Sequence, residues 1–188
     1  PHNGGSPWSA GCDESCTSGA EGGPGKRARS NPGTAPRSDP YIIGAGHRSA
    51  IGTLVERSTR FTILLHLPVD HRAETVAAAM LEAMAELPAH LRRSITWDRG
   101  SEMAGWQDIS LQLRAPVYFC DPHSPWQRGT NENTNRLLRH WFEKGGDLAG
   151  YTKADLNTVA DKLNTRPRPT LDLDTPAQRM AALISQAA

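Results

Sequence analysis

Two acidic residues, Asp98 and Glu132, have the chemistry to bind a metal ion together. Asp98 lies in the run 94–100, which predicts a short buried strand followed by a turn, and Glu132 lies in the first turn of a predicted helix. Carboxylates that converge from separate elements are the ligands that Mg²⁺ prefers at a phosphoryl-transfer site. Each acid alone also fits a simpler role, because Asp often caps a turn and the helix dipole favours an acid in a first turn.

Basic residues share the predicted helix with Glu132. Arg136 and His140 follow it at four-residue steps and Arg139 lies nearby, so these side chains are expected on one exposed face. On this face Glu132 could hold a metal ion while the arginines bind DNA phosphates. A solvated helix face with an intrahelical Glu–Arg pair predicts the same pattern.

The elements that must position these residues form a mixed α/β pattern. Three strands, then a helix, a strand, a helix, a strand and further helices predict layers of helix around a mixed sheet. Asp70, Thr130 and Thr175 are expected to cap three of the helices, and the turn 44–46 is expected to join a hairpin. The predicted strands are 41–43, 49–57, 61–67, 94–97 and 116–120, and the predicted helices cover 70–87, 106–113 and 153–163, with others starting at Thr130 and at Thr175-Pro176.

Residues 1–39 have the composition of a disordered tail, with 8 Gly, 5 Pro and 6 Ser and no Val, Ile, Leu, Met or Phe. Such a segment cannot bury enough apolar surface to offset its ordering entropy. A solvated tail is favoured over phosphate contacts by residues 26–29 or a metal site at Cys12 and Cys16. Residues 40–188 are expected to form one core domain.

The overall composition does not indicate which kind of partner the protein binds. A net charge of +1 and a pI of about 8.3 are too balanced to indicate a nucleic-acid partner. Three cysteines, an odd number, predict reduced thiols rather than a disulfide framework. No apolar stretch reaches the length of a membrane span and no signal peptide is evident, so a soluble intracellular protein without a membrane partner is expected.

The order of residue types in one segment is more specific than the spacing of the acids. Residues 118–135 read Tyr-Phe-Cys-Asp-Pro-His-Ser-Pro-Trp-Gln-Arg-Gly-Thr-Asn-Glu-Asn-Thr-Asn and closely resemble the signature of bacterial insertion-sequence transposases of the family numbered thirty. The resemblance continues through 49–57, 96–100 and 164–168, and it covers roughly residues 41–180 in the family's order.

The resemblance implies an RNase H-like fold, the integrase catalytic core, in which three acids known as DDE bind two Mg²⁺ or Mn²⁺ ions for DNA strand cleavage and transfer. Asp98 matches the second acid and Glu132 the third, whereas Asp121 matches no catalytic position. The family's first acid, counted back from Gly44, falls on Pro40, and Asp39 lies one residue too early. Since side chains alternate along a strand, Asp39 would point away from Asp98 unless a bulge corrects it.

The resemblance also stops near Pro40, without the helix-turn-helix region that relatives carry upstream. This predicts a truncated or frameshifted copy with a damaged first strand, whose metal site holds two carboxylates where three are needed. Element ends and target DNA are the implied partners, bound by a homo-oligomer without a small-molecule cofactor, in the bacterial cytoplasm at the nucleoid. Trp97 and Trp126 are interpreted as packing residues rather than base-stacking ones. The expected DNA contacts are Arg99, Arg128, Arg136, Arg139, Arg166 and Arg168, each of which also fits a solvated surface position.

Three functions fit these observations. The first is a transposase catalytic domain, and the second is a catalytically defective remnant that binds DNA or joins the oligomer of an intact transposase. The third is a structure-selective nuclease on the same fold, against which the signature at 126–133 argues. The target site, the element ends, the oligomeric state and the origin of residues 1–39 do not follow from the sequence.

Overall fold

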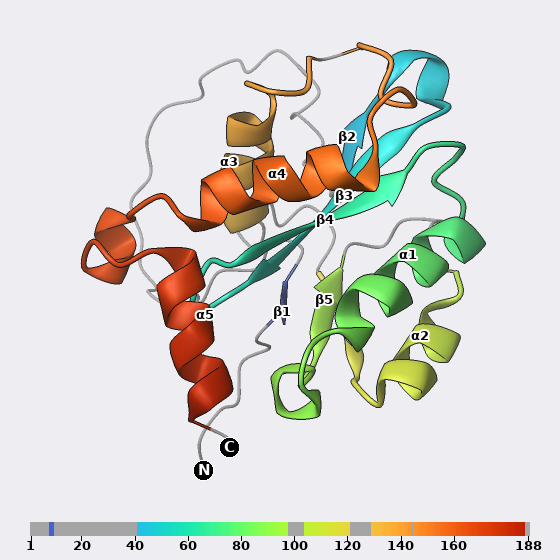
Figure 1. Ribbon diagram of the computed structural model, residues 1–188. Coiled ribbons are helices and arrows are strands. Elements are labelled where there is room, and N and C mark those ends of the chain that lie inside the picture. Colours follow the sequence, from blue (N-terminus) through green and yellow to red (C-terminus); the bar gives the residue numbers. More distant parts are fainter. Residues whose placement is uncertain (1–7, 10–40, 98–103, 121–128, 144, 187–188) are drawn as a thin grey trace, which may run out of the picture.

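The computed structural model describes residues 8–9, 41–97, 104–120, 129–143 and 145–186. Its described helices surround one mixed sheet (Figure 1). The strands are β1 (Trp8–Ser9), β2 (Tyr41–Ile43), β3 (Ala50–Glu56), β4 (Thr62–Leu67), β5 (Ile95–Trp97) and β6 (Val117–Phe119). The α-helices are α1 (Ala73–Ala85), α2 (Trp106–Leu113), α3 (Gly129–Leu138), α4 (Lys153–Asn164) and α5 (Pro176–Ser185), with 3-10 turns η1 (Ala45–His47), η2 (Ala89–Leu91) and η5 (Pro169–Leu171).

Strand β3 runs against its three neighbours β1, β2 and β4, while β1, β5 and β6 run parallel to one another. The sheet is therefore mixed, as the sequence predicts. Because β3 alone is reversed among the described strands, the carboxyl ends of the other five point to one edge. In α/β sheets this edge is where functional sites lie.

Two segments far apart in the sequence lie end to end beside β3. Ser9 of β1 pairs with Val55, and Tyr41 of β2 pairs with Gly52. The β3 residues Thr53 and Leu54 lie between these two pairings. The strands β1 and β2 thus share one strand position of the sheet, each as a short piece. Strand β1 belongs to residues 1–39, the segment whose composition predicts a disordered tail.

The sheet separates two apolar layers (Figure 1). Alternate side chains of each strand point to opposite faces, so β3 contributes Leu54 to the layer under α1 and α2 and Ile51 to the layer under α3 and α4. The first layer also holds the fully buried Trp97, and the second holds Phe142. Strands β2, β3 and β4 contribute side chains to both layers, and β5 and β6 contribute theirs to the layer under α1 and α2.

The local sequence explains where the later helices begin. Thr152 caps α4 and Thr175 caps α5, and each forms a reciprocal capping box with the residue three positions on. Pro176 at the first helical position of α5 confirms that predicted start. At the far end of α4, Asn164 accepts a hydrogen bond from the Thr62 amide and donates one to the Thr62 carbonyl, both at 2.8 Å.

Two predicted caps are wrong. Helix α1 begins at Ala73 rather than after Asp70, because Asp70 accepts hydrogen bonds from the Arg72 amide at 3.1 Å and the Thr75 hydroxyl at 2.6 Å and so orders the turn before the helix. Helix α3 begins at Gly129, which places Thr130 inside it. The remaining predicted strands and helices are found within a few residues of their expected bounds.

The turn between β2 and β3 confirms the predicted hairpin. Gly46 has a φ of 64°, a conformation that glycine adopts without steric cost. His47 follows with a φ of 56°, which is uncommon for a residue with a side chain.

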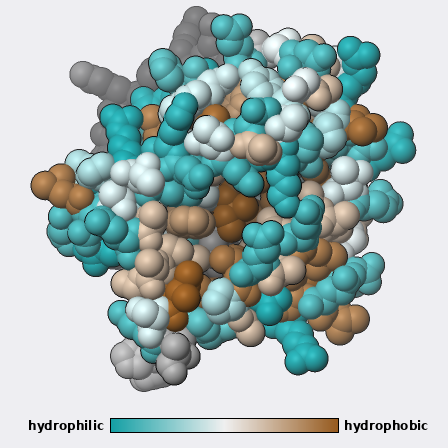
Figure 2. All heavy atoms as spheres, viewed as in Figure 1, coloured by the Kyte–Doolittle hydropathy of each residue, from teal (hydrophilic) through white to brown (hydrophobic). Residues whose placement is uncertain are grey.

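The visible surface is mostly polar. Figure 2 shows apolar groups in scattered patches among hydrophilic side chains on this face. The large exposed apolar residues come from separate elements, as with Val69 and Leu111. Among the residues that the structure describes, no helix has the length and apolar character needed to cross a membrane.

Candidate active site

The inward face of α3 is polar. Asn131, Thr134 and Asn135 are all buried there, with exposed fractions of 1%, 6% and 7%, and Leu138 continues the same side of the helix. Burial of amide and hydroxyl groups is costly unless they are hydrogen-bonded. Such a stripe of buried polar side chains therefore indicates a candidate functional site. These buried polar residues are not predicted from the sequence, because the buried side of an amphipathic helix is recognised by its apolar residues.

A hydrogen bond joins this stripe to strand β3 of the sheet. The Thr53 hydroxyl donates to Asn135 Oδ1 at 2.9 Å, and Thr53 is completely buried. Thr53 lies on the same side of β3 as Ile51, which packs in the layer under α3 and α4. The bond fixes α3 against β3 at the gap between β1 and β2. Asn135 lies one helical turn after Glu132.

Two aromatic residues lock the strands on the other side of the sheet. The Tyr41 and Trp97 rings lie 5.8 Å apart in an edge-on arrangement, and both are buried in the layer under α1 and α2. Trp97 is 0% exposed, which confirms its interpretation as a packing residue. Tyr41 follows position 40 and Trp97 precedes Asp98, so the contact ties together the strands that lead to these two positions.

Two of the three predicted catalytic residues, Asp39 and Asp98, lie outside the described part of the chain. The same holds for the predicted DNA contacts Arg99 and Arg128 and for Trp126, which is interpreted as a packing residue. Glu132 lies within α3, although its side chain is not among those described.

Two predicted DNA contacts are exposed beside α3. Arg136 donates through Nη2 to Asn133 Oδ1 at 3.0 Å, an interaction within the helix that leaves its guanidinium at the surface. Arg139 is also exposed and follows the last turn, where its amide donates to the Asn135 carbonyl at 3.1 Å. Both arginines therefore lie close in sequence and in space to the buried stripe of α3.

The other pair, Arg166 and Arg168, lies past the end of α4. Asn164 binds the start of β4, so these arginines are near the edge opposite to the carboxyl ends of β2 and β5. Arg168 donates weakly to the Leu163 carbonyl at 3.4 Å. Burial lowers the pKa of the Arg168 guanidinium, and the nearby charges of Arg166 and Arg60 lower it further. Three arginines thus gather at this corner, away from the Thr53–Asn135 pair.

Within the described ranges no three His, Cys, Asp or Glu side chains come together as a metal-binding group. The two carboxylates that the sequence singles out are not among the described side chains. The described surroundings are nevertheless polar, since Asn131 Oδ1 is buried and has no hydrogen-bond partner among the described residues. A metal ion with its water shell supplies the kind of donor that such an oxygen needs.

Comparison with solved structures identifies the class of fold. The catalytic core domain of BIV integrase superposes with a TM-score of 0.57 at 15% sequence identity, covering 79% of this chain and 96% of that one. A chain of the simian T-cell lymphotropic virus intasome in complex with PP2A regulatory subunit B56 gamma gives 0.56 at 18% identity, covering 73% of this chain and 50% of that one. The fold is an RNase H-like integrase catalytic core.

Sequence comparison narrows the class to a family. A family model described as Integrase core domain matches residues 35–125. The transposase for insertion sequence element IS1086 of Cupriavidus metallidurans is 46% identical over 144 residues, which are 77% of this chain and 42% of the relative. Transposase InsI for insertion sequence element IS30C of Escherichia coli is 46% identical over 137 residues, 73% of this chain and 36% of the relative.

The chain belongs to the integrase core family and, within it, to the insertion-sequence transposases of the IS30 type. It spans less than half of the length of these curated relatives, 42% and 36% respectively. The family resemblance predicted from residues 118–135 is thereby confirmed.

Proposed function

We propose that this chain carries the catalytic core of a DDE transposase whose metal site lacks the first acid; enzymes of this class cleave DNA strands at the ends of an insertion sequence and join them to a target with the help of divalent metal ions. The observation that carries the proposal is the buried hydrogen bond between Thr53 and Asn135. It holds the helix that contains Glu132 against the strand position where the family places its first acid.

The pairing of the strands supports this location. Tyr41 pairs with Gly52, so that the same register continued by one residue would set position 40 opposite Thr53. Ser9 of β1 pairs with Val55 of β3 on one side and with Thr96 of β5 on the other. If both pairings continued by two residues, Thr53 of β3 and Asp98 would lie level with each other across the sheet. By these two registers, position 40 and Asp98 would lie in the same row across the sheet as Thr53. Of these three positions, Thr53 is the described one.

The alternation of side chains along a strand indicates toward which face of the sheet each acid would point. Tyr41 and Trp97 face α1 and α2, whereas Ile42 faces α3 and α4. An acid at position 40 or at 98, continuing these strands, would therefore point toward α3. The same argument would turn Asp39 toward α1, so Asp39 is a poor substitute for the first acid.

Asp98 and Glu132 are the residues that would hold Mg²⁺ or Mn²⁺. Bound there, two such ions would activate the attacking oxygen and stabilise the leaving oxygen at phosphorus. The buried amides of Asn131 and Asn135 would orient α3 beneath these carboxylates. Arg136 and Arg139, exposed beside them, would bind backbone phosphates, and Arg99 and Arg128 would extend this contact. A homo-oligomer on DNA in the bacterial nucleoid is the expected assembly.

One observation favours the alternative function, a catalytically defective remnant that binds DNA or joins an intact transposase. The strand that should carry the first acid consists of β1 and β2, two pieces that leave Thr53 and Leu54 between their pairings. Position 40 is Pro. A site with two acids instead of three would bind the metal ions more weakly and would not hold them for in-line displacement.

The proposal is tested by titrating the chain with Mn²⁺ in a calorimeter and by measuring cleavage of DNA that contains the cognate element ends. Heat of Mn²⁺ binding should be lost in D98N and in E132Q, with little change in the melting temperature. Asp108→Asn, on the exposed side of α2, is the matched control. Binding heat that survives both substitutions would refute the proposed site.

A further inference from the structure

Strand β1 links the two halves of the sheet (Figure 1). Among the described pairings, β2, β3 and β4 are joined to one another, and β5 is joined to β6. Both groups pair with Trp8 and Ser9 of β1, and none of the described pairings joins β3 directly to β5. These two residues thus complete the sheet between its antiparallel part and its parallel part.

Strand β1 is a separate piece of chain within the sheet. Ser9 of β1 and Tyr41 of β2 occupy the same strand position, opposite residues of β3 that are three positions apart. Two residues would be enough to connect them along that strand, yet residues 10–40 lie between them in the sequence. Pairing with its neighbours therefore holds β1 in place, and β1 is not an extension of β2.

The strands on either side direct backbone groups toward β1. The Glu56 amide donates at 2.7 Å to the residue before β4, and the Ile95 amide donates at 2.9 Å to the residue before β6. Because successive backbone groups along a strand alternate in direction, those of Val55 and Thr96 point to the other side, where β1 lies. Both residues are level with Ser9. Backbone donors and acceptors therefore line this row from two sides.

The position between β3 and β5 is also buried. Val55 is 1% exposed and Thr96 is 7% exposed. Buried backbone groups are costly when they are unpaired, so this position requires an extended segment between the two strands. The next row passes through Glu56 and Ile95, and Ile95 packs in the layer under α1 and α2. This row favours a large apolar residue, and the chain has Trp8 there.

We infer that the position between β3 and β5 is a peptide-binding site, which takes a short extended segment with a large apolar residue by backbone pairing on both sides. In this chain residues 8–9 occupy the site. Since pairing and not chain continuity holds them, the same segment supplied by a separate molecule can take their place. The inference does not depend on the proposed function, because it concerns neither metal ions nor DNA.

The experiment measures the binding of a fluorescent peptide with the sequence of residues 5–11 by anisotropy. It compares the parent chain with W8P/S9P, since proline removes the backbone donors that a central strand needs and so vacates the site. The variant should bind the peptide about tenfold more tightly than the parent, in which the tethered segment competes. S18P/G19P, with the same change outside the described strands, is the matched control and should bind like the parent.

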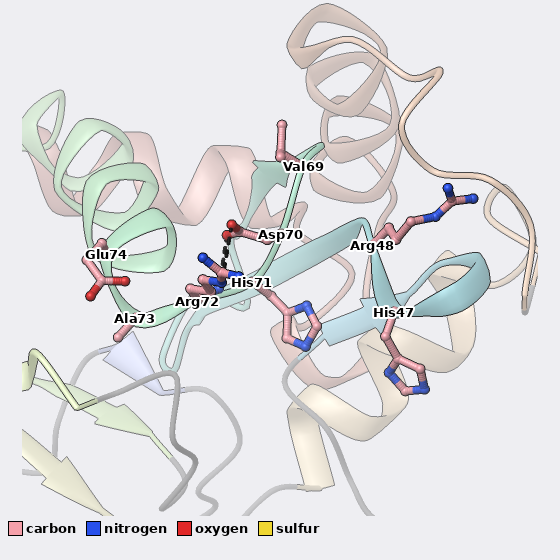
Figure 3. Close-up of a pocket in the computed structure, with 8 residues that line it drawn as sticks. All are labelled: His47, Arg48, Val69, Asp70, His71, Arg72, Ala73 and Glu74. Carbon is pink, nitrogen blue, oxygen red and sulfur yellow. Dashed lines mark hydrogen bonds and ion pairs between the residues drawn. The ribbon is translucent and has the colours of Figure 1, made fainter.

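A cavity of about 590 Å³ between the turn after β2 and the start of α1 is another place where a peptide could bind (Figure 3). Its walls include Arg48 and Arg72, and Figure 3 shows Arg72 beside Asp70 and Arg48 directed away from it. Adding R48A/R72A to W8P/S9P should leave peptide binding unchanged. Loss of binding in this combination would assign the peptide to the cavity and would overturn the inference.

Hydrogen exchange measures the backbone pairing itself. The amides of Val55 and Thr96 should exchange about tenfold faster in W8P/S9P and should return toward the parent rate when the peptide is added. Trp8→Ala keeps the backbone donors and should give intermediate peptide affinity, which tests the site even if the proline variant does not fold. Equal peptide binding by the parent and Trp8→Ala, or no protection of the two amides by the peptide, would overturn the inference.

Discussion

The Thr53 hydroxyl and the Asn135 amide oxygen form a buried hydrogen bond of 2.9 Å that joins strand β3 of the sheet to α3, 82 positions later in the chain. Asn135 lies one helical turn beyond Glu132. The bond therefore controls how closely the helix with the proposed third acid approaches the row of the sheet proposed for the first acid. It is the described contact that relates sheet geometry to the proposed metal site most directly.

Replacing Thr53 by Val keeps the shape of the side chain and removes the donor to Asn135. The loss of one buried hydrogen bond should lower the free energy of unfolding by about 1–3 kcal/mol. Mn²⁺ affinity should fall as well, because α3 would be less firmly placed. Thr62→Val is the control, since this buried threonine of β4 lies away from α3. Equal losses of Mn²⁺ affinity in the two variants would contradict a positioning role for Thr53.

Glu56 should contribute to stability through the turn after β3. Its buried carboxylate accepts from the amides of Ser58 at 3.1 Å and Thr59 at 2.6 Å, and from both hydroxyls of these residues. Glu56→Gln weakens several charge-assisted bonds and should cost about 2–3 kcal/mol in a urea titration. Glu82→Gln, at an exposed position, should leave the urea midpoint nearly unchanged. If the two variants unfold alike, the Glu56 network is not stabilising.

Asn164 should protect the outer edge of β4. Its side chain satisfies both the amide and the carbonyl of Thr62, each at 2.8 Å, so that α4 covers the first residue of this edge strand. Asn164→Ala leaves these backbone groups unpaired and should lower the free energy of unfolding by about 2–3 kcal/mol. Light scattering on heating should also begin earlier. Asn157→Ala, on the exposed side of α4, should do neither, and earlier scattering in that control would refute the edge argument.

The capping box of α4 should make stability depend on pH. Hydrogen bonds from the backbone and then the hydroxyl of Thr152 lower the pKa of Asp155. A carboxyl whose pKa is lower in the folded state stabilises the fold above its ordinary pKa, and this contribution is lost as the pH falls through the lowered value. Asp155→Asn should therefore flatten the fall in urea midpoint between about pH 5 and about pH 2. An unaltered pH profile in this variant would contradict the assigned role.

Local sequence signals predicted the outer elements of the fold well. Thr175-Pro176 marks the start of α5, and the apolar spacing of α4 identifies the buried residues Leu156 and Leu163. Such signals lie within one element and need no knowledge of its neighbours. They fail where a competing local interaction decides the boundary, as when Asp70 orders the turn before α1.

The candidate site was predicted only in part, for a physical reason. The signature around Glu132 identified the family, yet nothing in the spacing of Asn131, Thr134 and Asn135 marked them as buried, because amphipathic patterns are recognised by apolar residues. The pairing of Thr53 with Asn135 depends on long-range packing. The use of Trp8 and Ser9 as a strand beside β3 likewise depends on an open position in the sheet, which the composition of the tail does not reveal.

The metal site proposed for this integrase core lacks only its first acid, at position 40. The direct measurement compares strand transfer on cognate element ends by the parent chain, by Pro40→Asp and by Asp39→Asn. The parent should be nearly inactive, Asp39→Asn should not differ from it, and Pro40→Asp should gain Mn²⁺-dependent activity. Robust strand transfer by the parent that Asp39→Asn abolishes, with no gain in Pro40→Asp, would contradict the claim.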